Sequence, residues 1–372
     1  MERNPFASLV SPFVRRIRPY VPGKPVEEVR REKGLRHVVK LASNENPLGP
    51  SPAAARAVHD MVTGLHRYPD GYGFALKQAL AARWGVGPEN LVLGNGSSEV
   101  IEIVVRLLVR PGDEVVLASP SFSIYELAVE AQGGIPVSVP LREHAVDLDA
   151  IARAVGERTS LVVLGNPNNP TGTVFHRPEW ERFLQELGPG VGVLLDEAYA
   201  EYVTDPQVPV GREYLEEDRP LVVVRTFSKA YGLASLRIGY GIAPRGLVDY
   251  MNRLRLPFNA NGAAQAAARA ALGDRDHLER SAALNREGLS RLYALFDRLG
   301  LEYLPSQANF VAVRVGDGDR VFRALLDRGV IVRSVRSFGM PEWIRVTVGL
   351  PGELDRFEEA FAEVMGEEGS RE

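Results

Sequence analysis

The chain has 372 residues, of which 45% are hydrophobic and 25% are charged, a composition typical of a globular protein with two or three domains. It contains no cysteine, which excludes disulfide frameworks, thiolate metal sites and thiol nucleophiles. With 44 lysines and arginines against 48 acidic side chains the net charge is −4, so the overall charge favours neither nucleic acid nor a membrane as a partner. No signal segment is recognisable, and the apolar runs are far shorter than the roughly 18 residues of a membrane span, so we expect a cytoplasmic location.

The first 272 residues predict an arm followed by a large α/β domain. Residues 1–40 are rich in proline and weakly periodic, and we expect them to form an N-terminal arm and part of a smaller domain. In residues 41–272, short β-branched runs alternate with stretches of helical periodicity, which predicts a mostly parallel, seven-stranded sheet covered by helices. Ligands of such sheets bind beyond the carboxyl ends of the strands. The seven runs are Leu91–Leu93, Glu114–Ala118, Ile135–Val139, Leu161–Leu164, Val191–Leu195, Leu221–Arg225 and Leu236–Ile242.

The pattern changes near the end of the large domain. An alanine-rich stretch, Gly262–Leu272, leads into a long helical pattern that ends near Arg298. Short strands then alternate with two helices, so we expect residues 273–372 to form a smaller α+β domain. The expected strands are Asn309–Val315, Val330–Arg333 and Trp343–Val348, and the expected helices are Asp319–Asp327 and Gly352–Val364.

Two loops at the ends of expected strands carry polar groups in unusual density. Gly94–Glu99 is a glycine-rich turn into a helix, which suits an anion because free backbone N–H groups and the helix dipole point outward. A plain capped turn explains this motif equally well. Gly165–Gly172 contains two prolines and three asparagines, which fix a rigid turn whose amides face the sheet edge. An amide donor there suits a phenolate oxygen on a ring.

Two further strand ends carry charged groups. Asp196 ends the run Val191–Leu195, where a buried carboxylate needs a partner such as a protonated pyridine nitrogen; the alternative is a helix N-cap. Thr226–Lys229 follows the next run, and Lys229 is the only lysine after residue 77. Its amine could form a Schiff base with an aldehyde cofactor, while Arg237 could hold a phosphate. Taken alone, this motif is more typical of a surface lysine after a strand.

Together these groups match one cofactor, pyridoxal 5′-phosphate, which needs an amine, an acid for its ring nitrogen, donors for its ring oxygen and a phosphate cup. The order and spacing of Asn169–Gly172, Asp196–Tyr199, Ser228-Lys229 and Arg237 resemble the fold-type I pyridoxal-phosphate aminotransferases. Within them the chain is similar to histidinol-phosphate aminotransferases and their aromatic aminotransferase relatives. The closer likeness depends on Leu41–Pro50, Arg67–Asp70 and Arg345–Gly349. None of the six histidines forms a close ligand pair, so we expect no metal site.

The resemblance implies a role for each residue around the cofactor. Lys229 would bind the cofactor covalently and later move the proton, and Asp196 would pair with the pyridinium nitrogen. Asn169 and Tyr199 would hydrogen-bond the ring hydroxyl, and Tyr125 would stack on the ring. The residues expected around the cofactor phosphate are Ser97, Ser98, Thr226, Ser228 and Arg237, with Tyr68 reaching in from a second subunit. The active unit implied is a homodimer with shared active sites.

The resemblance also implies residues that hold the substrate. Arg345 matches the family's carboxylate-binding arginine, and Arg333 matches a second arginine thought to help hold the phosphate of histidinol phosphate. A guanidinium fork binds carboxylate and phosphate alike. Tyr20, Tyr125 and Phe258 match positions that form an aromatic cage around the imidazole. The alternatives are surface salt bridges for the arginines and ordinary core packing for Phe258.

The activity implied is the transfer of an amino group between L-histidinol phosphate and 2-oxoglutarate in histidine biosynthesis. Three alternatives stay open. Phe258 suits an aromatic side chain as well as an imidazole, which allows an aromatic amino acid aminotransferase. The same fold also allows a phosphothreonine-type decarboxylase. A non-catalytic, cofactor-binding regulator is disfavoured because every catalytic position is occupied.

Overall fold

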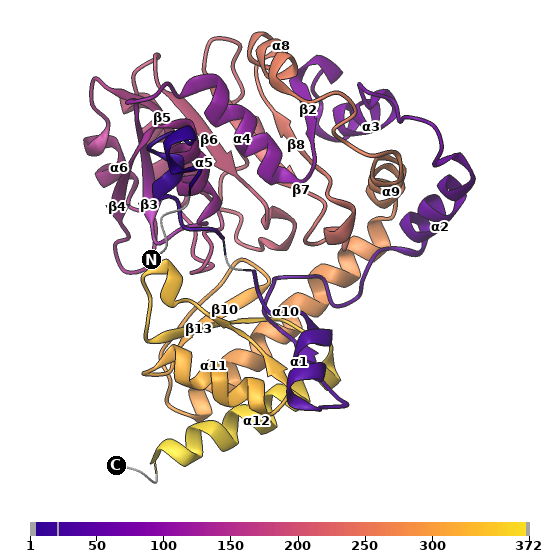
Figure 1. Ribbon diagram of the computed structural model, residues 1–372, viewed down its shortest axis with the longest axis vertical. Coiled ribbons are helices and arrows are strands. Elements are labelled where there is room, and N and C mark those ends of the chain that lie inside the picture. Colours follow the sequence, from indigo (N-terminus) through magenta and orange to yellow (C-terminus); the bar gives the residue numbers. More distant parts are fainter. Residues whose placement is uncertain (1–4, 21, 370–372) are drawn as a thin grey trace.

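The computed structural model describes residues 5–20 and 22–369 and shows two layered bodies, the larger one above the smaller (Figure 1). The larger body is built on a seven-stranded sheet in which only β8 runs antiparallel to its neighbours, β2 and β7. The α/β fold with a mostly parallel sheet, predicted from the sequence, is therefore confirmed. Across the sheet the strands are β2 (Leu91–Gly94), β8 (Gly239–Ile242), β7 (Leu221–Thr226), β6 (Gly192–Asp196), β5 (Thr159–Gly165), β3 (Glu114–Ser119) and β4 (Ile135–Pro140).

The last of these strands along the chain, β8, starts later than predicted. The run Leu236–Ile242 is apolar throughout, but Ala234–Leu236 forms a 3₁₀ turn and Arg237 adopts a left-handed conformation with φ 56°. The strand begins only at Gly239. This turn directs the Arg237 side chain back toward the sheet edge that carries the other polar loops.

Helices cover both faces of the sheet because side chains on each strand alternate between them. On β3, Val115 and Leu117 pack in one cluster, whereas Val116 and Ala118 pack in the other. The first face is covered by α4 (Ser97–Leu108), α5 (Ile124–Gln132) and α8 (Arg245–Leu254). The other face is covered by α3 (Phe74–Trp84), α6 (Leu148–Ala154), α7 (Arg177–Glu186) and α9 (Gly262–Gly273), and α2 (Pro52–Met61) packs on α9.

The smaller body combines two sheets with four helices. Its four-stranded antiparallel sheet has the order β12 (Arg333–Ser334), β13 (Trp343–Thr347), β10 (Phe310–Arg314), β9 (Tyr303–Leu304). A separate pair joins β1 (Val39–Lys40) to β11 (Val330–Ile331) in parallel. The helices are α1 (Val26–Lys33), α10 (Arg275–Arg298), α11 (Gly318–Asp327) and α12 (Pro351–Gly369).

The pairing of β1 with β11 ties the segment before residue 41 to the smaller body. The long helix α10 begins directly after Asp274, whose side chain caps it by accepting the His277 N–H at 3.2 Å. We propose that the chain divides into three parts, with boundaries after residues 40 and 272. The first boundary follows β1, and the second lies beside the point where α9 ends and α10 begins.

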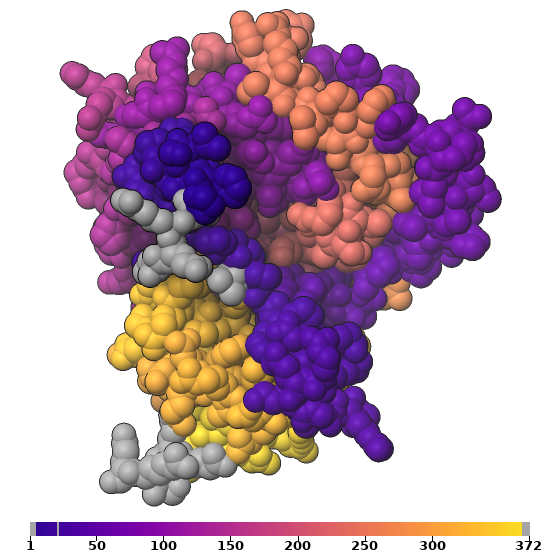
Figure 2. Space-filling view, in the orientation of Figure 1, coloured from indigo at the N-terminus to yellow at the C-terminus, as the bar shows by residue number. Residues whose placement is uncertain are grey.

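The N-terminal segment contains more regular structure than its sequence suggests. Helix α1 begins after Pro25, which has an extended backbone, and ends at Gly34, which is left-handed with φ 66°. Only Val29 on this helix is buried, so its apolar periodicity is too weak to be recognised. Figure 2 shows the preceding arm, in deep indigo, lying on the larger body, where the Phe13 ring lies over Gly133.

Short 3₁₀ turns complete the architecture. They are η1 (Ala7–Leu9), η2 (Val14–Arg16), η3 (Val62–Gly64), η4 (Pro88–Asn90), η5 (Ala200–Tyr202), η6 (Gly211–Tyr214), η7 (Ala234–Leu236) and η8 (Arg336–Phe338). Among residues 5–20 and 22–369, no helix combines the length and the apolar character that crossing a bilayer requires.

Candidate active site

One cavity lies between the carboxyl edge of the large sheet and the smaller body. It gathers polar side chains from segments that follow five strands of the sheet, as expected for an open α/β fold. Of the fifteen candidate site residues from the sequence, thirteen line it: Tyr20, Ser97, Ser98, Tyr125, Asn169, Asp196, Tyr199, Thr226, Ser228, Lys229, Arg237, Arg333 and Arg345. Tyr68 and Phe258 lie outside the cavity, where their rings stack at 4.7 Å.

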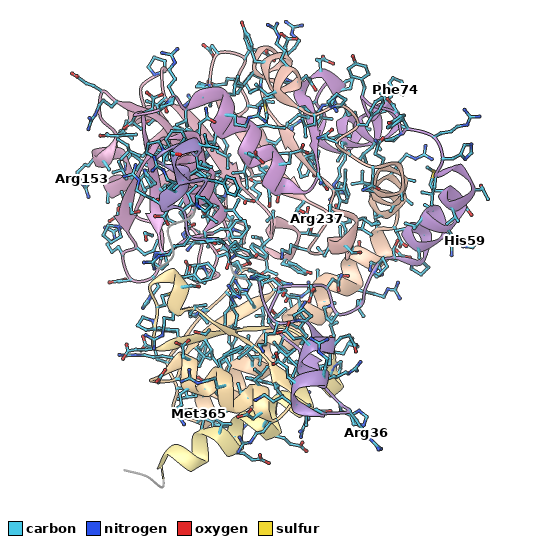
Figure 3. All side chains as sticks on the ribbon, viewed as in Figure 1. Arg36, His59, Phe74, Arg153, Arg237 and Met365 are labelled. Carbon is cyan, nitrogen blue, oxygen red and sulfur yellow. The ribbon has the colours of Figure 1, made fainter. Side chains whose placement is uncertain are left out.

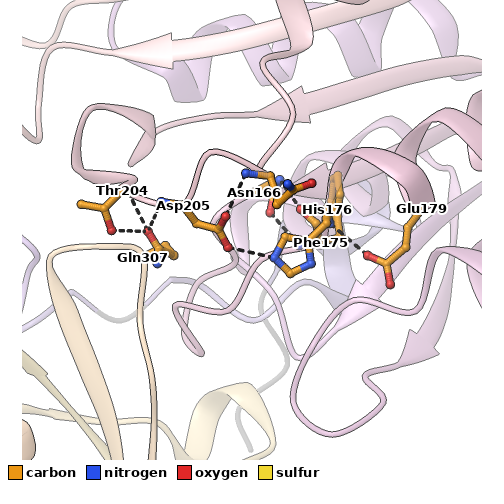
Figure 4. Close-up of polar contacts among 8 residues, drawn as sticks. Asn166, Phe175, His176, Glu179, Thr204, Asp205 and Gln307 are labelled. Atoms are coloured by element: carbon orange, nitrogen blue, oxygen red, sulfur yellow. Dashed lines mark hydrogen bonds and ion pairs between the residues drawn. The ribbon is translucent and has the colours of Figure 1, made fainter.

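Side chains of the two bodies fix the loop after β5 and the segment after β6 (Figure 4). Asn166 donates to the Phe175 carbonyl at 3.3 Å and accepts the Phe175 N–H at 3.1 Å, which closes the loop that carries Asn169. From the smaller body, the Gln307 amide oxygen accepts the Thr204 N–H at 2.8 Å and the Asp205 N–H at 3.3 Å. These bonds hold the smaller body against the segment that follows β6.

The turn into α4 forms a cradle for an anion. Gly96 has a positive φ of 77°, and a Cβ atom there would collide with the Arg237 guanidinium. Arg237, labelled near the centre of Figure 3, also donates to the Ser228 hydroxyl at 3.4 Å. Because the first N–H groups of α4 have no helical acceptors and the helix dipole favours negative charge, this turn suits a phosphate group.

Asp196 lies at the end of β6 and is 4% exposed. Its Oδ2 accepts the Tyr125 hydroxyl at 2.9 Å, and its Oδ1 accepts the Ala198 N–H at 3.0 Å. Burial raises the pKa of Asp196 to about 6, although the Tyr125 bond opposes the shift. A carboxylate this well buried from solvent is stabilised by a positively charged partner, and a protonated ring nitrogen provides one.

Lys229 points into the same cavity and donates to the Ser43 carbonyl at 3.1 Å. Burial, with a smaller contribution from the charge of Arg345, lowers the pKa of Lys229 to about 8. At pH 7 about a tenth of such an amine is neutral, far more than at the ordinary pKa, and the neutral form is the one that can attack an aldehyde.

Tyr199 and Asn169 provide the polar groups between Lys229 and the smaller body. The Tyr199 hydroxyl accepts an N–H from the Asn44 amide at 2.8 Å, and burial raises the pKa of Tyr199 to about 12, so the phenol keeps its proton. Asn169 Oδ1 accepts from the Arg345 guanidinium, which links the loop after β5 to β13.

Arg345 brings a buried cation into the site from the smaller body. Its Nη2 donates to the Ala42 carbonyl at 2.8 Å, whereas its buried Nε has no hydrogen-bond partner among residues 5–20 and 22–369. Burial lowers the pKa of Arg345 to about 10, and the nearby Arg333 adds to the shift. Two guanidinium groups therefore line the same end of the cavity, a suitable place for an anionic substrate.

Comparison with known proteins agrees with this geometry. The family model for aminotransferase class I and II matches residues 36–361. A histidinol-phosphate aminotransferase of Moorella thermoacetica is 47% identical over 94% of this chain and 91% of its own length. Another from Nitrosococcus oceani is 47% identical over 99% of this chain and 100% of its own. The chain belongs to the histidinol-phosphate aminotransferases.

A solved member of this family supports the cofactor assignment. The structure of histidinol-phosphate aminotransferase from Sinorhizobium meliloti in complex with pyridoxal-5′-phosphate has a TM-score of 0.90 and 31% identity. The alignment covers 97% of this chain and 98% of that one. The present histidinol-phosphate aminotransferase is thus a fold-type I, pyridoxal-phosphate-dependent enzyme. The cradle at Gly96, the buried Asp196 and the amine of Lys229 fit that cofactor, which supplies an electron sink for amino-group transfer when bound.

Sequence reasoning missed two features of this aminotransferase site. Asn44 lies in the motif Leu41–Pro50 that carried the family likeness, but nothing local indicated its contact with Tyr199. The second is a buried ion-pair network beneath the site, in which Arg225 contacts Glu197 at 2.6 Å and Glu201 at 2.9 Å. Its only sequence signal is a charged residue inside the apolar run Leu221–Thr226.

Proposed function

We propose that this enzyme transfers an amino group between L-histidinol phosphate and 2-oxoglutarate, a step of histidine biosynthesis, in the cytoplasm. The observation that carries the choice of substrate is the pair Arg345 and Arg333 at one end of the cavity. The Nε of Arg345, which finds no partner in the part of the chain that the structure describes, leaves a guanidinium edge for a carboxylate or phosphate group. A single pair of arginines can therefore serve the phosphate of one substrate and the carboxylates of the other.

Around the cofactor, we assign Lys229 to covalent attachment and proton movement, and Asp196 to the ring nitrogen. Tyr199 and Asn169 would hydrogen-bond the ring oxygen, while Tyr125 would cover the ring face. In support, all five side chains line one cavity. The residues assigned to the phosphate are Ser97, Ser98, Thr226, Ser228 and Arg237.

A homodimer belongs to the same proposal. Tyr68 is 83% exposed and stacks on Phe258, which is 44% exposed, so neither ring is held by a core of its own chain. Large apolar side chains gather beside them, and exposed apolar patches of this kind mark interfaces. The large apolar side chains exposed in segments 62–74 and 256–258 are Val62, Leu65, Tyr68, Tyr72, Phe74, Leu256 and Phe258. We assign Tyr68 to the cofactor phosphate of a second subunit. Because Phe258 stacks on Tyr68, we assign it to the substrate cage of that second subunit, where it would join that subunit's own Tyr20.

The substrate is tested by comparing kcat/KM for L-histidinol phosphate, L-histidinol and phenylalanine with 2-oxoglutarate as acceptor. Discrimination between substrates lies in this ratio. We expect L-histidinol phosphate to exceed both others by about 100-fold or more, the size of effect that a buried charge contact can supply.

The variant Arg333→Gln should reduce that preference for the phosphorylated substrate while leaving kcat/KM for L-histidinol nearly unchanged. Equal losses for the two substrates would remove Arg333 from the phosphate site. Preference for phenylalanine would instead favour the aromatic aminotransferase, and release of carbon dioxide would favour the decarboxylase.

A further inference from the structure

Asn44 joins three segments that are far apart in the sequence. It is 1% exposed and lies between Tyr199 of the larger body and Thr347 on β13 of the smaller body. Its Nδ2 donates to the Tyr199 hydroxyl at 2.8 Å, and its Oδ1 accepts the Thr347 hydroxyl at 3.0 Å. Its backbone N–H also donates to the Thr347 hydroxyl, at 3.1 Å.

In this series of hydrogen bonds, from Thr347 through Asn44 to Tyr199, each donor and acceptor has a defined direction. The Thr347 hydroxyl oxygen accepts the backbone N–H of Asn44, and its one proton is donated to Asn44 Oδ1. The amide therefore presents its nitrogen, a donor, to Tyr199. Since the Tyr199 oxygen accepts this bond, the Tyr199 proton is free to point into the cavity.

The backbone at this position favours the same residue. Asn44 is left-handed with φ 55°, a conformation in which asparagine and glycine are much more frequent than other residues. The preceding residue, Ser43, accepts the Lys229 amine through its carbonyl. Adjacent residues of one turn thus contact both Lys229 and Tyr199.

Strand β13 of the smaller body contacts this turn through the hydrogen bonds between Thr347 and Asn44. Thr347 and Arg345 are two residues apart on that strand and so lie on the same face. Thr347 pairs with Phe310 on β10, whose ring packs edge-on against Tyr199 at 5.3 Å. The strand that carries the buried arginine therefore also holds the turn that orients Tyr199.

We propose that Asn44 is a positioning residue that directs the Tyr199 hydroxyl proton toward the ring oxygen of the cofactor, with its own orientation set by Thr347. The proposal rests on the role assigned to Tyr199 under the proposed function. A donated proton stabilises a negatively charged ring oxygen, so its loss makes that oxygen easier to protonate.

The test measures the pH midpoint at which the visible absorbance of the cofactor-loaded enzyme changes. Asn44→Gly keeps the left-handed backbone and removes the amide, and Asn44→Asp keeps the shape but offers Tyr199 an acceptor in place of a donor. Thr347→Val removes the hydroxyl that orients the amide. The titratable groups nearest Tyr199, namely Tyr20, Asp196, Lys229 and Arg345, stay unchanged in all three variants, and only Asn44→Asp adds a charge.

We expect the midpoint to rise by about half a unit to one unit in Asn44→Gly, equivalent to a three- to tenfold change in a dissociation constant. It should rise further in Asn44→Asp and in the same direction in Thr347→Val. Tyr199→Phe should raise it as well, and adding Asn44→Gly to Tyr199→Phe should then produce no further shift, because the two residues act through one proton.

The outcomes separate the two levels of the proposal. If Tyr199→Phe leaves the midpoint unchanged, the role of Tyr199 fails and the inference about Asn44 fails with it. If Tyr199→Phe shifts the midpoint but Asn44→Gly and Thr347→Val do not, the inference about Asn44 alone is overturned, and a lowered melting temperature would then mark a purely structural residue.

Discussion

At the scale of single residues, the site depends on charges held in dry surroundings. Lys229 is the clearest case, because its only hydrogen bond among the described residues is to the Ser43 carbonyl, and burial outweighs the opposing charges of Glu45 and Asp196. Its lowered pKa, about 8 against the ordinary value of 10.5, means that folding disfavours the charged amine. The neutral form needed to bind the cofactor is therefore available at moderate pH.

The variant Lys229→Met measures how far the buried charged amine lowers the unfolding free energy of the cofactor-free protein. Below pH 8 the native amine is charged in both folded and unfolded chains, and its burial destabilises the fold by on the order of 2–3 kcal/mol relative to methionine. Between pH 8 and 10.5 only the unfolded chain keeps the proton, so the native protein regains stability as the pH rises. Urea unfolding should thus show Lys229→Met to be the more stable at pH 7, with the difference nearly gone at pH 10.5. A difference independent of pH would contradict the lowered pKa.

At the scale of elements, the ends of β6 and β7 are joined by the ion pairs that lie under the site. Arg225 on β7 contacts Glu197 and Glu201, and its guanidinium lies 4.2 Å from the centre of the Trp84 ring on α3. The other oxygen of Glu197 accepts the Gly211 N–H at 2.6 Å. Because Glu197 follows Asp196 directly, this network fixes the backbone that presents Asp196 to the cavity.

Replacing Arg225 with methionine should cost about 3–5 kcal/mol of unfolding free energy at pH 8, because it leaves two buried carboxylates unpaired. Burial already raises the pKa of Glu201 and Arg225 opposes that shift, so the pKa rises further without the arginine. Protonation then removes the penalty, and the loss should be smaller at pH 5 than at pH 8. Denaturant titration of both proteins at pH 5 and at pH 8 measures this difference in unfolding free energy.

Arg253→Met provides a matched control, since Arg253 pairs with Asp249 in the open, with side chains 64% and 62% exposed. Its loss should cost less than about 1 kcal/mol. Equal losses for the two variants would show that the buried pairs contribute no more than a surface pair.

The sequence predicts elements well where the chemistry is local and poorly where partners are distant. Asp196 and Lys229 are identifiable from the sequence because Asp196 directly follows a buried run and Lys229 lies in the short polar segment after the next one. Helix α1 was not expected, since a single buried residue, Val29, gives no periodic signal. The contact between Asn44 and Tyr199 spans 155 residues, and that with Thr347 spans 303, so no local pattern could predict either.

At the scale of the whole molecule, two bodies and two subunits are expected to complete one site. Arg345 enters from the smaller body, and the exposed Tyr68 has no place in the cavity of its own chain. The proposed homodimer therefore predicts that a subunit lacking a functional Tyr68 and a subunit lacking a functional Lys229 form one intact active site when they pair.

Mixing Tyr68→Ala and Lys229→Ala subunits in equal amounts tests this directly. Random pairing makes half of the dimers mixed, and one of the two sites in each mixed dimer is then intact, so about a quarter of the native activity should return. Each variant alone should show far less. Measurement of turnover after subunit exchange decides, and activity no higher than the average of the two variants would contradict a shared site.

The central claim is that the Lys229 cavity removes the amino group of L-histidinol phosphate. The most direct measurement mixes the cofactor-loaded enzyme with L-histidinol phosphate, without any 2-oxo acid, and follows the visible absorbance of the cofactor through a single turnover. We predict a rapid, complete change that phenylalanine produces about 100-fold more slowly and that Lys229→Met does not show at all. A faster change with phenylalanine, or an unimpaired change in Lys229→Met, would contradict the account.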